Sequence, residues 1–245
     1  MNYKIEISYD GSNYQGWQKQ TNTKRTIQGI IEGKLQEIFK QRIEIHGSGR
    51  TDAGVHANGQ VANFGVPEEL FRSVFLERIN SILPTDIKVN EIEKVNDKFH
   101  SRLSAISKEY IYQIDLREKA DVFTRKYKYH YPYEIDCRKI KEASAYFIGT
   151  HDFRSFTSEK RQEKSCVRTI HDIKVERVEN QLSIQIRGNG FLYNMVRIIV
   201  GTLLEVGKGD SKVSDINKIM EMKERVNAGE TVPPNGLFLN KVFYR

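Results

Sequence analysis

The stretch at residues 46–57 is the part of the chain best suited to chemistry, because it sets one acid and one arginine among three glycines. The acid is Asp52, and the arginine is Arg50. Glycine lets the backbone turn sharply and lets a ligand come close. Such a loop presents a carboxylate at the floor of a cleft, where it acts as a nucleophile or as a base. The alternative is a tight turn in which Arg50 or Thr51 satisfies the charge of Asp52.

Familiar ligand-binding patterns are missing from the sequence. A dinucleotide fingerprint of the GxGxxG type needs glycine where Asp52 stands, and there is no phosphate loop of the GxxxxGK[ST] type. His46 and His56 have no third partner at metal-ligand spacing. The two cysteines, Cys137 and Cys166, form no CxxC pair, so neither a structural zinc site nor a disulfide framework is indicated. We therefore expect no metal and no cofactor.

Two residues outside this stretch suit a binding site. Arg197 lies in an apolar segment at residues 191–206, and a buried guanidinium needs an anionic or a carbonyl partner. Glu205, two helical turns further along the same face, is one candidate partner. Tyr110 shares one face of a predicted strand with Tyr112. A tyrosine in that position either belongs to the core or offers its ring to a ligand.

Basic residues exceed acidic ones, with 39 Lys and Arg against 32 Asp and Glu and a formal net charge of +7. Most of the excess lies beyond residue 104, where residues 125–131 interleave basic and aromatic side chains. Lys160, Arg161 and Lys164 share a polar loop. Such a surface suits an anionic partner, of which nucleic acid is the commonest. A solvated basic surface without a partner is the alternative.

Hydrophobic periodicity predicts an α+β protein in which helices pack on a largely antiparallel sheet. Thr26 suits the N-cap of the first helix, and Pro67 suits the first turn of the second. Strands are expected at residues 3–9, 43–46, 60–64, 87–95, 108–116, 170–178, 182–187 and 237–244. Helices are expected at residues 27–39, from Pro67, from Asp136 to residue 148, and at residues 191–206 and 214–225.

Two halves are expected, although no linker rich in Pro or Ser separates them. Residues 1–104 form an N-terminal α/β half with the catalytic loop. Residues 105–245 form a C-terminal α/β half with the basic surface and the helix of Arg197. The first residues lack the unbroken apolar core of a signal peptide, and charges interrupt the longest apolar stretch. We therefore expect a cytoplasmic protein without a membrane-spanning segment.

The run Gly-Ser-Gly-Arg-Thr-Asp-Ala-Gly-Val-His-Ala at residues 47–57 is followed by Gly-Gln-Val-Ala-Asn-Phe at residues 59–64. Together these runs resemble the signature of the TruA-type tRNA pseudouridine synthases. Residues 107–114, 188–197 and 232–239 are similar to three further motifs of that family. Val232 departs from the last motif, which often begins with alanine. The resemblance extends over the whole chain, because these segments recur from one end to the other.

The resemblance implies a role for each candidate residue. Asp52 is the catalytic aspartate, Tyr110 stacks on the target base, and Arg197 pairs with Asp52 and keeps it ionised. We expect Arg50 to help to displace or hold the flipped nucleotide. The implied reaction is isomerisation of uridine to pseudouridine in the anticodon stem-loop of tRNA, around positions 38 to 40, without a cofactor.

The resemblance also implies a fold and an assembly. The fold consists of two RNA-recognition-like halves that form an extended antiparallel sheet with helices packed on one face. The assembly is a homodimer that binds tRNA and no membrane. Two rival functions remain at this point. A non-catalytic RNA-binding protein needs neither Asp52 nor the helical arginine, and a glycoside or nucleoside hydrolase generally needs a second placed carboxyl group.

Overall fold

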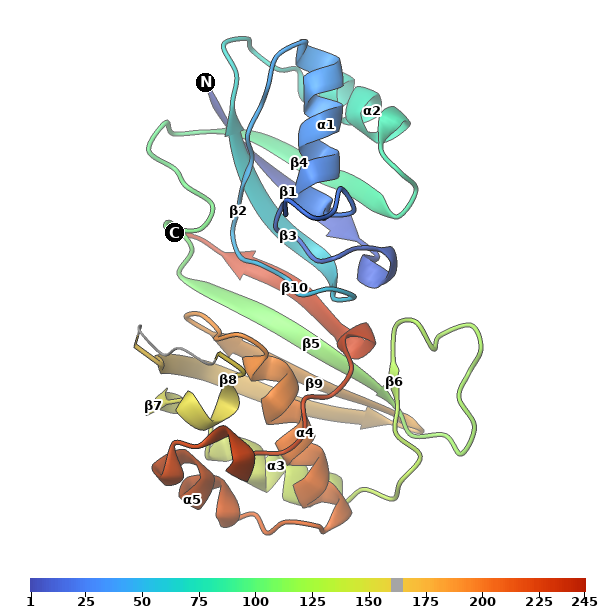
Figure 1. The fold of residues 1–245 in the computed structure, drawn as a ribbon, viewed down its shortest axis with the longest axis vertical. Coiled ribbons are helices and arrows are strands. Elements are labelled where there is room, and N and C mark those ends of the chain that lie inside the picture. The colour runs from blue at the N-terminus through green and yellow to red at the C-terminus, as the bar shows by residue number, and fades with distance from the viewer. Residues whose placement is uncertain (160–164) are drawn as a thin grey trace. The chain divides into compact units, whose positions relative to one another are not determined.

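The computed structural model describes residues 1–159 and 165–245, which fall into two compact units (Figure 1). Unit 1 comprises Met1–Ile106 and Phe238–Arg245, and unit 2 comprises Ser107–Leu237. Each unit combines largely antiparallel strands with helices. The predicted α+β class is therefore confirmed.

Unit 1 is built on a sheet whose strands come from both ends of the chain. β1 lies between β3 and β4 and runs antiparallel to both, while β10 runs parallel to β3 on its other side. The sequence pattern grouped β10 with the second half, because alternation within a strand does not identify its partner. The elements are β1 (Asn2–Tyr9), β2 (His46–Gly47), β3 (His56–Gly65), β4 (Ile87–Val95), β10 (Leu237–Phe243), α1 (Ile27–Phe39) and α2 (Arg72–Ile82).

The two helices of unit 1 cover one face of its sheet. The ring centroid of Phe64 on β3 lies 6.5 Å from that of Phe39 on α1 and 6.0 Å from that of Phe75 on α2. The rings of Phe39 and Phe75 also stack on each other. Thr26 is the N-cap of α1, as predicted, and its side chain accepts a hydrogen bond from the Gly29 N–H at 3.3 Å.

The predicted helix start at Pro67 is wrong, because α2 begins at Arg72. The backbone N–H of Leu70 donates to the hydroxyl of Tyr3 on β1 at 2.9 Å. This bond ties the segment ahead of α2 to the sheet and delays the helix. Pro67 suits the first turn of a helix, but the hydrogen bond between Leu70 and Tyr3 holds this segment on the sheet, so the helix begins later.

The strand predicted at residues 43–46 is also displaced, since β2 is limited to His46–Gly47. The backbone N–H of Ile45 donates to the carboxylate of Glu32 on α1 at 3.2 Å instead of to a neighbouring strand. Glu32 is itself buried and pairs with Lys19 at 2.8 Å. A side chain from a helix therefore takes the place of a ladder bond.

In unit 2, β9 lies between β5 and β8, and β7 pairs with β8. These pairs are antiparallel, and β6 pairs with β5 in parallel. Periodicity did not predict β6 or β7, because strands of two and four residues are too short to show alternation. The elements are β5 (Ser107–Asp115), β6 (Tyr129–His130), β7 (Gly149–Asp152), β8 (Val167–Val178), β9 (Gln181–Gly188), α3 (Cys137–Ala145), α4 (Met195–Lys208) and α5 (Asp215–Met222).

α3 and α4 pack against each other, α3 on β8 and α4 on β5 (Figure 1). Asp136 is the N-cap of α3, as predicted, and accepts from the Arg138 N–H at 2.9 Å. α3 ends at Ala145, short of the predicted residue 148, because the next N–H groups bond only three residues back. Short 3-10 helices lie at Gly11–Asn13, Arg154–Phe156, Arg225–Asn227 and Pro234–Gly236.

α4 starts at Met195, later than the predicted range of 191–206. Asn194 adopts a left-handed φ of 61°, which the interior of a helix does not allow. α5 ends earlier than predicted for the same reason, since Lys223 has a φ of 54°. Most of α4 is buried. No helix in the described part of the chain has the length and apolar character needed to cross a membrane.

Candidate active site

Asp52 lies in the loop between β2 and β3 of unit 1, between two buried residues of that loop. Thr51 before it and Val55 are buried, whereas Asp52 is half-buried. The backbone N–H of Val55 donates to the carbonyl oxygen of Asp52 at 3.1 Å, which closes a tight turn. The loop therefore holds the backbone of Asp52 in place while part of its side chain stays accessible to solvent.

The segment around Trp17 packs against the Asp52 loop so closely that a side chain would not fit between them. The N–H of Trp17 donates to the carbonyl oxygen of Thr51 at 3.0 Å. Gly16 has a φ of 88°, and a Cβ built on it would lie 2.5 Å from that oxygen. Glycine is required there for its backbone angle and for the space. This contact fixes the peptide that precedes Asp52.

A buried polar network supports the same loop from the side of the sheet. Gln60 on β3 is fully buried, and its amide group donates to the Gly49 carbonyl at 2.9 Å and accepts from the Ser48 hydroxyl at 2.7 Å. The hydroxyls of Tyr9 and Thr51 share a hydrogen bond of 2.7 Å. Buried hydrogen bonds thus hold both ends of the segment that leads to the carboxylate.

Sequence reasoning did not single out Tyr9 or Gln60. Burial raises the pKa of the Tyr9 phenol, against the lowering effect of its bonds to Thr51 and Gln60, so the hydroxyl stays neutral. Gln60 lies within the Gly-Gln-Val-Ala-Asn-Phe run that follows the Asp52 loop. A buried amide needs partners for all of its polar atoms, but β3 also carries Asn58 and Asn63, so the sequence alone did not single out Gln60.

Arg50 and Thr51, the two residues ahead of Asp52, form hydrogen bonds with Gln18 and Tyr9. The hydroxyl of Thr51 pairs with Tyr9, and the Nε of Arg50 donates to the side-chain oxygen of Gln18 at 3.3 Å. The side chain of Arg50 is exposed. A long cation therefore stands at the surface, two residues from Asp52 in the chain.

Arg197 lies in the first turn of α4 and is half-buried, where the sequence predicted full burial. Its Nε donates to the carbonyl oxygen of Val232 at 2.6 Å, and its Nη1 donates to the side-chain oxygen of Asn194 at 3.1 Å. A carbonyl is one of the two predicted kinds of partner, and these bonds orient the guanidinium. The side chain of Glu205, the other candidate, accepts from the Glu230 N–H at 3.3 Å.

Tyr110 lies on β5, and 7% of it is exposed. Its ring meets that of Phe191 edge-on, with centroids 5.2 Å apart. Tyr112, on the same face, donates its hydroxyl to the Pro233 carbonyl at 2.6 Å. Burial raises the pKa of Tyr112, and the positive charge of Arg197 opposes the shift. Arg197 therefore lies close to Tyr112 on β5, two residues along the strand from Tyr110.

The four predicted site residues fall into two pairs. Arg50 and Asp52 share one loop of unit 1, whereas Tyr110 and Arg197 belong to β5 and α4 of unit 2. The segment at residues 232–236 connects the elements of the second pair, because its carbonyl groups accept from both β5 and α4. Each pair is therefore positioned by elements of its own unit.

Comparisons with known proteins agree over nearly the whole chain. The sequence model of a family described as tRNA pseudouridine synthase matches residues 6–103 and 143–245. The chain belongs to this family. A tRNA pseudouridine synthase A of Bacillus licheniformis is 47% identical over 100% of this chain and 99% of its own. Relatives of the same name from Bacillus pumilus and Acetivibrio thermocellus are 44% and 43% identical, over 100% and 99% of this chain and 99% of each relative.

Membership of the tRNA pseudouridine synthase family makes the chain an isomerase. An isomerase is neither a hydrolase nor a protein that only binds RNA. The family therefore excludes the two rival functions, the hydrolase and the non-catalytic RNA-binding protein. In the ranges that the structure describes, no group of three His, Cys, Asp or Glu side chains is placed to hold a metal ion. The chemistry that these residues offer is that of a carboxylate, guanidinium groups and aromatic rings.

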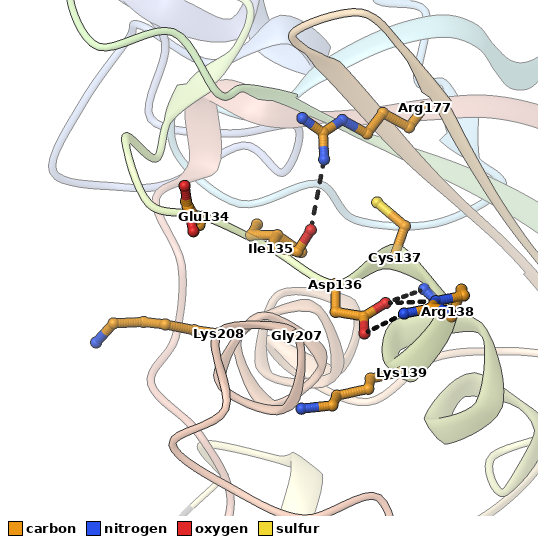
Figure 2. Close-up of a pocket in the computed structure, with 9 residues that line it drawn as sticks. All are labelled: Glu134, Ile135, Asp136, Cys137, Arg138, Lys139, Arg177, Gly207 and Lys208. Carbon is orange, nitrogen blue, oxygen red and sulfur yellow. Dashed lines mark hydrogen bonds and ion pairs between the residues drawn. The ribbon is translucent and has the colours of Figure 1, made fainter.

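Unit 2 of this synthase also has a cavity of about 600 Å³ that contains none of the four predicted site residues (Figure 2). One of its two acids, Asp136, caps α3, and hydrogen bonds from Arg138 hold the pKa of Asp136 below its usual value. That carboxylate is engaged by its own helix and is unsuited to proton transfer. The cavity is lined by Glu134, Ile135, Asp136, Cys137, Arg138, Lys139, Arg177, Gly207 and Lys208. Basic side chains outnumber acidic ones in this lining. Lys160, Arg161 and Lys164, which belong to the predicted basic surface, lie outside the described residues.

Proposed function

We propose that this synthase converts uridine to pseudouridine in the anticodon stem-loop of tRNA, around positions 38 to 40, with Asp52 as its catalytic carboxylate. The reaction breaks the bond between N1 of uracil and C1′ of ribose and joins C1′ to C5 of the same base. C5 loses its proton and N1 gains one, so atoms and electrons balance and neither a redox partner nor an energy source is needed. One carboxylate that acts as nucleophile or as base suffices.

The observation that carries this proposal is the way in which the Asp52 loop is held. The carboxylate is half-buried, and buried bonds from Tyr9 and Gln60 hold the residues ahead of it. A reacting group that is already in place loses little freedom when the substrate binds.

Arg197 and Tyr110 complete the proposed site from unit 2. Arg197, whose guanidinium is oriented by its bonds to Val232 and Asn194, has the proposed role of favouring the ionised form of Asp52. Tyr110 stacks on the uracil ring, since every base offers a face to an aromatic side chain. Because 7% of Tyr110 is exposed, the base enters by displacing groups that cover the ring.

Arg50 takes part in base flipping in this proposal. A uridine within a stem must leave the stack before a protein group reaches its reacting atoms. The side chain of Arg50 is exposed and carries a single long hydrogen bond to Gln18, so it can leave that partner at little cost. It then enters the duplex or holds the extruded nucleotide beside Asp52.

The test is Asp52→Asn in the full-length protein, incubated with unmodified tRNA and followed by mapping of pseudouridine by position. We expect formation of pseudouridine to cease while binding of tRNA persists, because the amide keeps the shape of the side chain and loses its charge and basicity. Asp97→Asn, at an exposed aspartate of the same unit, is the matched control and keeps full activity. Residual activity combined with lost binding would contradict the proposal.

The proposal also includes a homodimer and a cytoplasmic location, both of which rest on the family resemblance. Sedimentation equilibrium measures the mass of the assembly directly. A mass equal to that of one chain under assay conditions would remove the homodimer from the proposal. Fractionation of cells followed by immunodetection tests the location.

A further inference from the structure

The loop between β5 and β6, residues 116–128, presents an unusually exposed aromatic side chain. Phe123 is 87% exposed, the highest value among the large hydrophobic side chains in the described part of the chain. Val122 beside it is 62% exposed. Figure 1 shows the loop standing away from α3, α4 and α5 of unit 2. Burial in the core therefore does not explain why these positions are apolar.

The loop is held in shape by its own polar groups. Arg117 donates two hydrogen bonds of 2.8 Å to Asp115 and lies 3.2 Å from Asp121. Asp121 accepts from the N–H of Phe123 at 2.9 Å through its side chain and from the N–H of Arg125 at 2.9 Å through its backbone. Phe123 is thus displayed on a defined turn. An aromatic side chain that is already ordered binds a ligand with a small loss of entropy.

The same loop is tied to the segment that holds Arg197. The side-chain NH2 of Asn235 donates to the carbonyl oxygens of Arg125 at 2.8 Å and Lys128 at 3.0 Å. Val232, three residues earlier, accepts from Arg197. Within unit 2, one short segment therefore positions both the exposed aromatic loop and an arginine of the proposed active site.

Basic side chains outnumber acidic ones in the loop that carries the exposed ring. Lys119, Arg125 and Lys126 are exposed, while of the two acids Asp121 is paired with Arg117 and Glu118 is exposed. An aromatic face next to cations fits a nucleic acid, because bases stack on the ring and phosphates bind the cations. The family model matches residues 6–103 and 143–245, so the loop lies outside both matched segments.

We propose that Phe123 stacks on an unpaired base of the tRNA substrate, and that Arg125 and the neighbouring lysines bind the adjoining phosphates. This inference rests on the proposed function and adds a contact remote from the chemistry. It predicts a role in binding and none in the reacting step. A stacked aromatic side chain of this kind changes affinity by roughly ten-fold or more.

The experiment compares Phe123→Ala, Phe123→Trp and Phe71→Ala in the full-length protein. We expect Phe123→Ala to raise KM for tRNA and the tRNA dissociation constant about ten-fold, with kcat unchanged. Phe123→Trp retains the affinity, because indole stacks as well as phenyl does. Phe71 is 74% exposed in unit 1, so Phe71→Ala makes the same chemical change elsewhere and leaves KM unaltered. Because Phe123 and Phe71 are both exposed, we expect the melting temperatures of all three variants to stay close to that of the parent protein.

A Phe123→Ala variant with unchanged KM and unchanged tRNA affinity would overturn the inference. So would a change in sedimentation, since the loop would then contact a second protein copy and not RNA. The two proposals fail separately. If the parent protein forms no pseudouridine, the proposed function fails, while direct tRNA binding by the variants still tests the loop.

Discussion

At the scale of single residues, Gln60 and Tyr9 explain how a polar loop can hold a carboxylate steady. Gln60 is fully buried and contacts Ser48 and Gly49, which lie four and three residues ahead of Asp52. A buried amide that loses a partner costs about 1–3 kcal/mol, so the paired arrangement strongly favours one loop conformation. Order at Asp52 thus comes from groups that do not take part in the chemistry.

Gln60→Met tests this positioning role. We expect a loss of stability of about 1–3 kcal/mol, because Ser48 and Gly49 lose their partner. We further expect kcat at saturating tRNA to fall roughly ten- to hundred-fold, since a small displacement of a reacting group is costly. Denaturant unfolding measures the first effect, and single-turnover formation of pseudouridine measures the second.

The control for this variant is Asn63→Leu on the same strand. Asn63 is buried and bonds to Asn2 at 3.1 Å and to the Ser101 N–H at 2.8 Å. The stability loss should be similar, while kcat stays close to that of the parent protein. Equal losses of kcat in the two variants would show that Gln60 acts only through general stability.

At the scale of elements, the segment at residues 232–236 organises unit 2. Its carbonyl groups accept from Arg197 and Tyr112, and its Asn235 side chain holds the loop between β5 and β6. Gly236 ends the segment against β5, where a Cβ would lie 2.6 Å from the carbonyl oxygen of Gln113. Two backbones approach so closely there that a methyl group forces them apart.

Gly236→Ala is therefore expected to destabilise the protein by about 1–3 kcal/mol, as overpacking does. It should also lower activity, because the carbonyl partners of Arg197 and Tyr112 shift with the backbone. Gly33→Ala is the contrasting control, since a Cβ at this position of α1 meets nothing within 4 Å. There the same substitution should stabilise the helix by about 0.5–1 kcal/mol. Thermal melts decide the sign of both effects.

At the scale of the whole molecule, the net charge of +7 favours association with a polyanion. Phosphate contacts release counterions, so affinity for tRNA falls as salt rises. We expect KM for tRNA to rise at least ten-fold between roughly 50 and 200 mM salt while kcat changes little. Initial rates over a salt series, with melting temperatures in the same buffers as the control, measure this. A flat KM would mean that charge does not drive binding.

The division into two units is also a property of the whole molecule. β10 returns to unit 1, where Phe238 lies opposite His56 on β3 and the two rings stack 4.7 Å apart. Strand alternation found β10 nearly as the structure has it, yet its partner is about 180 residues away in the chain. Pairing over such a distance depends on the folded sheet and leaves no local pattern.

The sequence by itself determined the family, the α+β class, and most helices and strands, and it supplied the candidate residues for the site. Those features are local, because they depend on periodicity, capping residues and short motifs. Only the tertiary structure decided that α2 starts at Arg72, that Thr51 pairs with Tyr9, and that Val232 and Pro233 receive the bonds of Arg197 and Tyr112. These hydrogen bonds join residues 35 to 121 positions apart, and a pattern read along the chain carries no record of which distant groups burial will bring together.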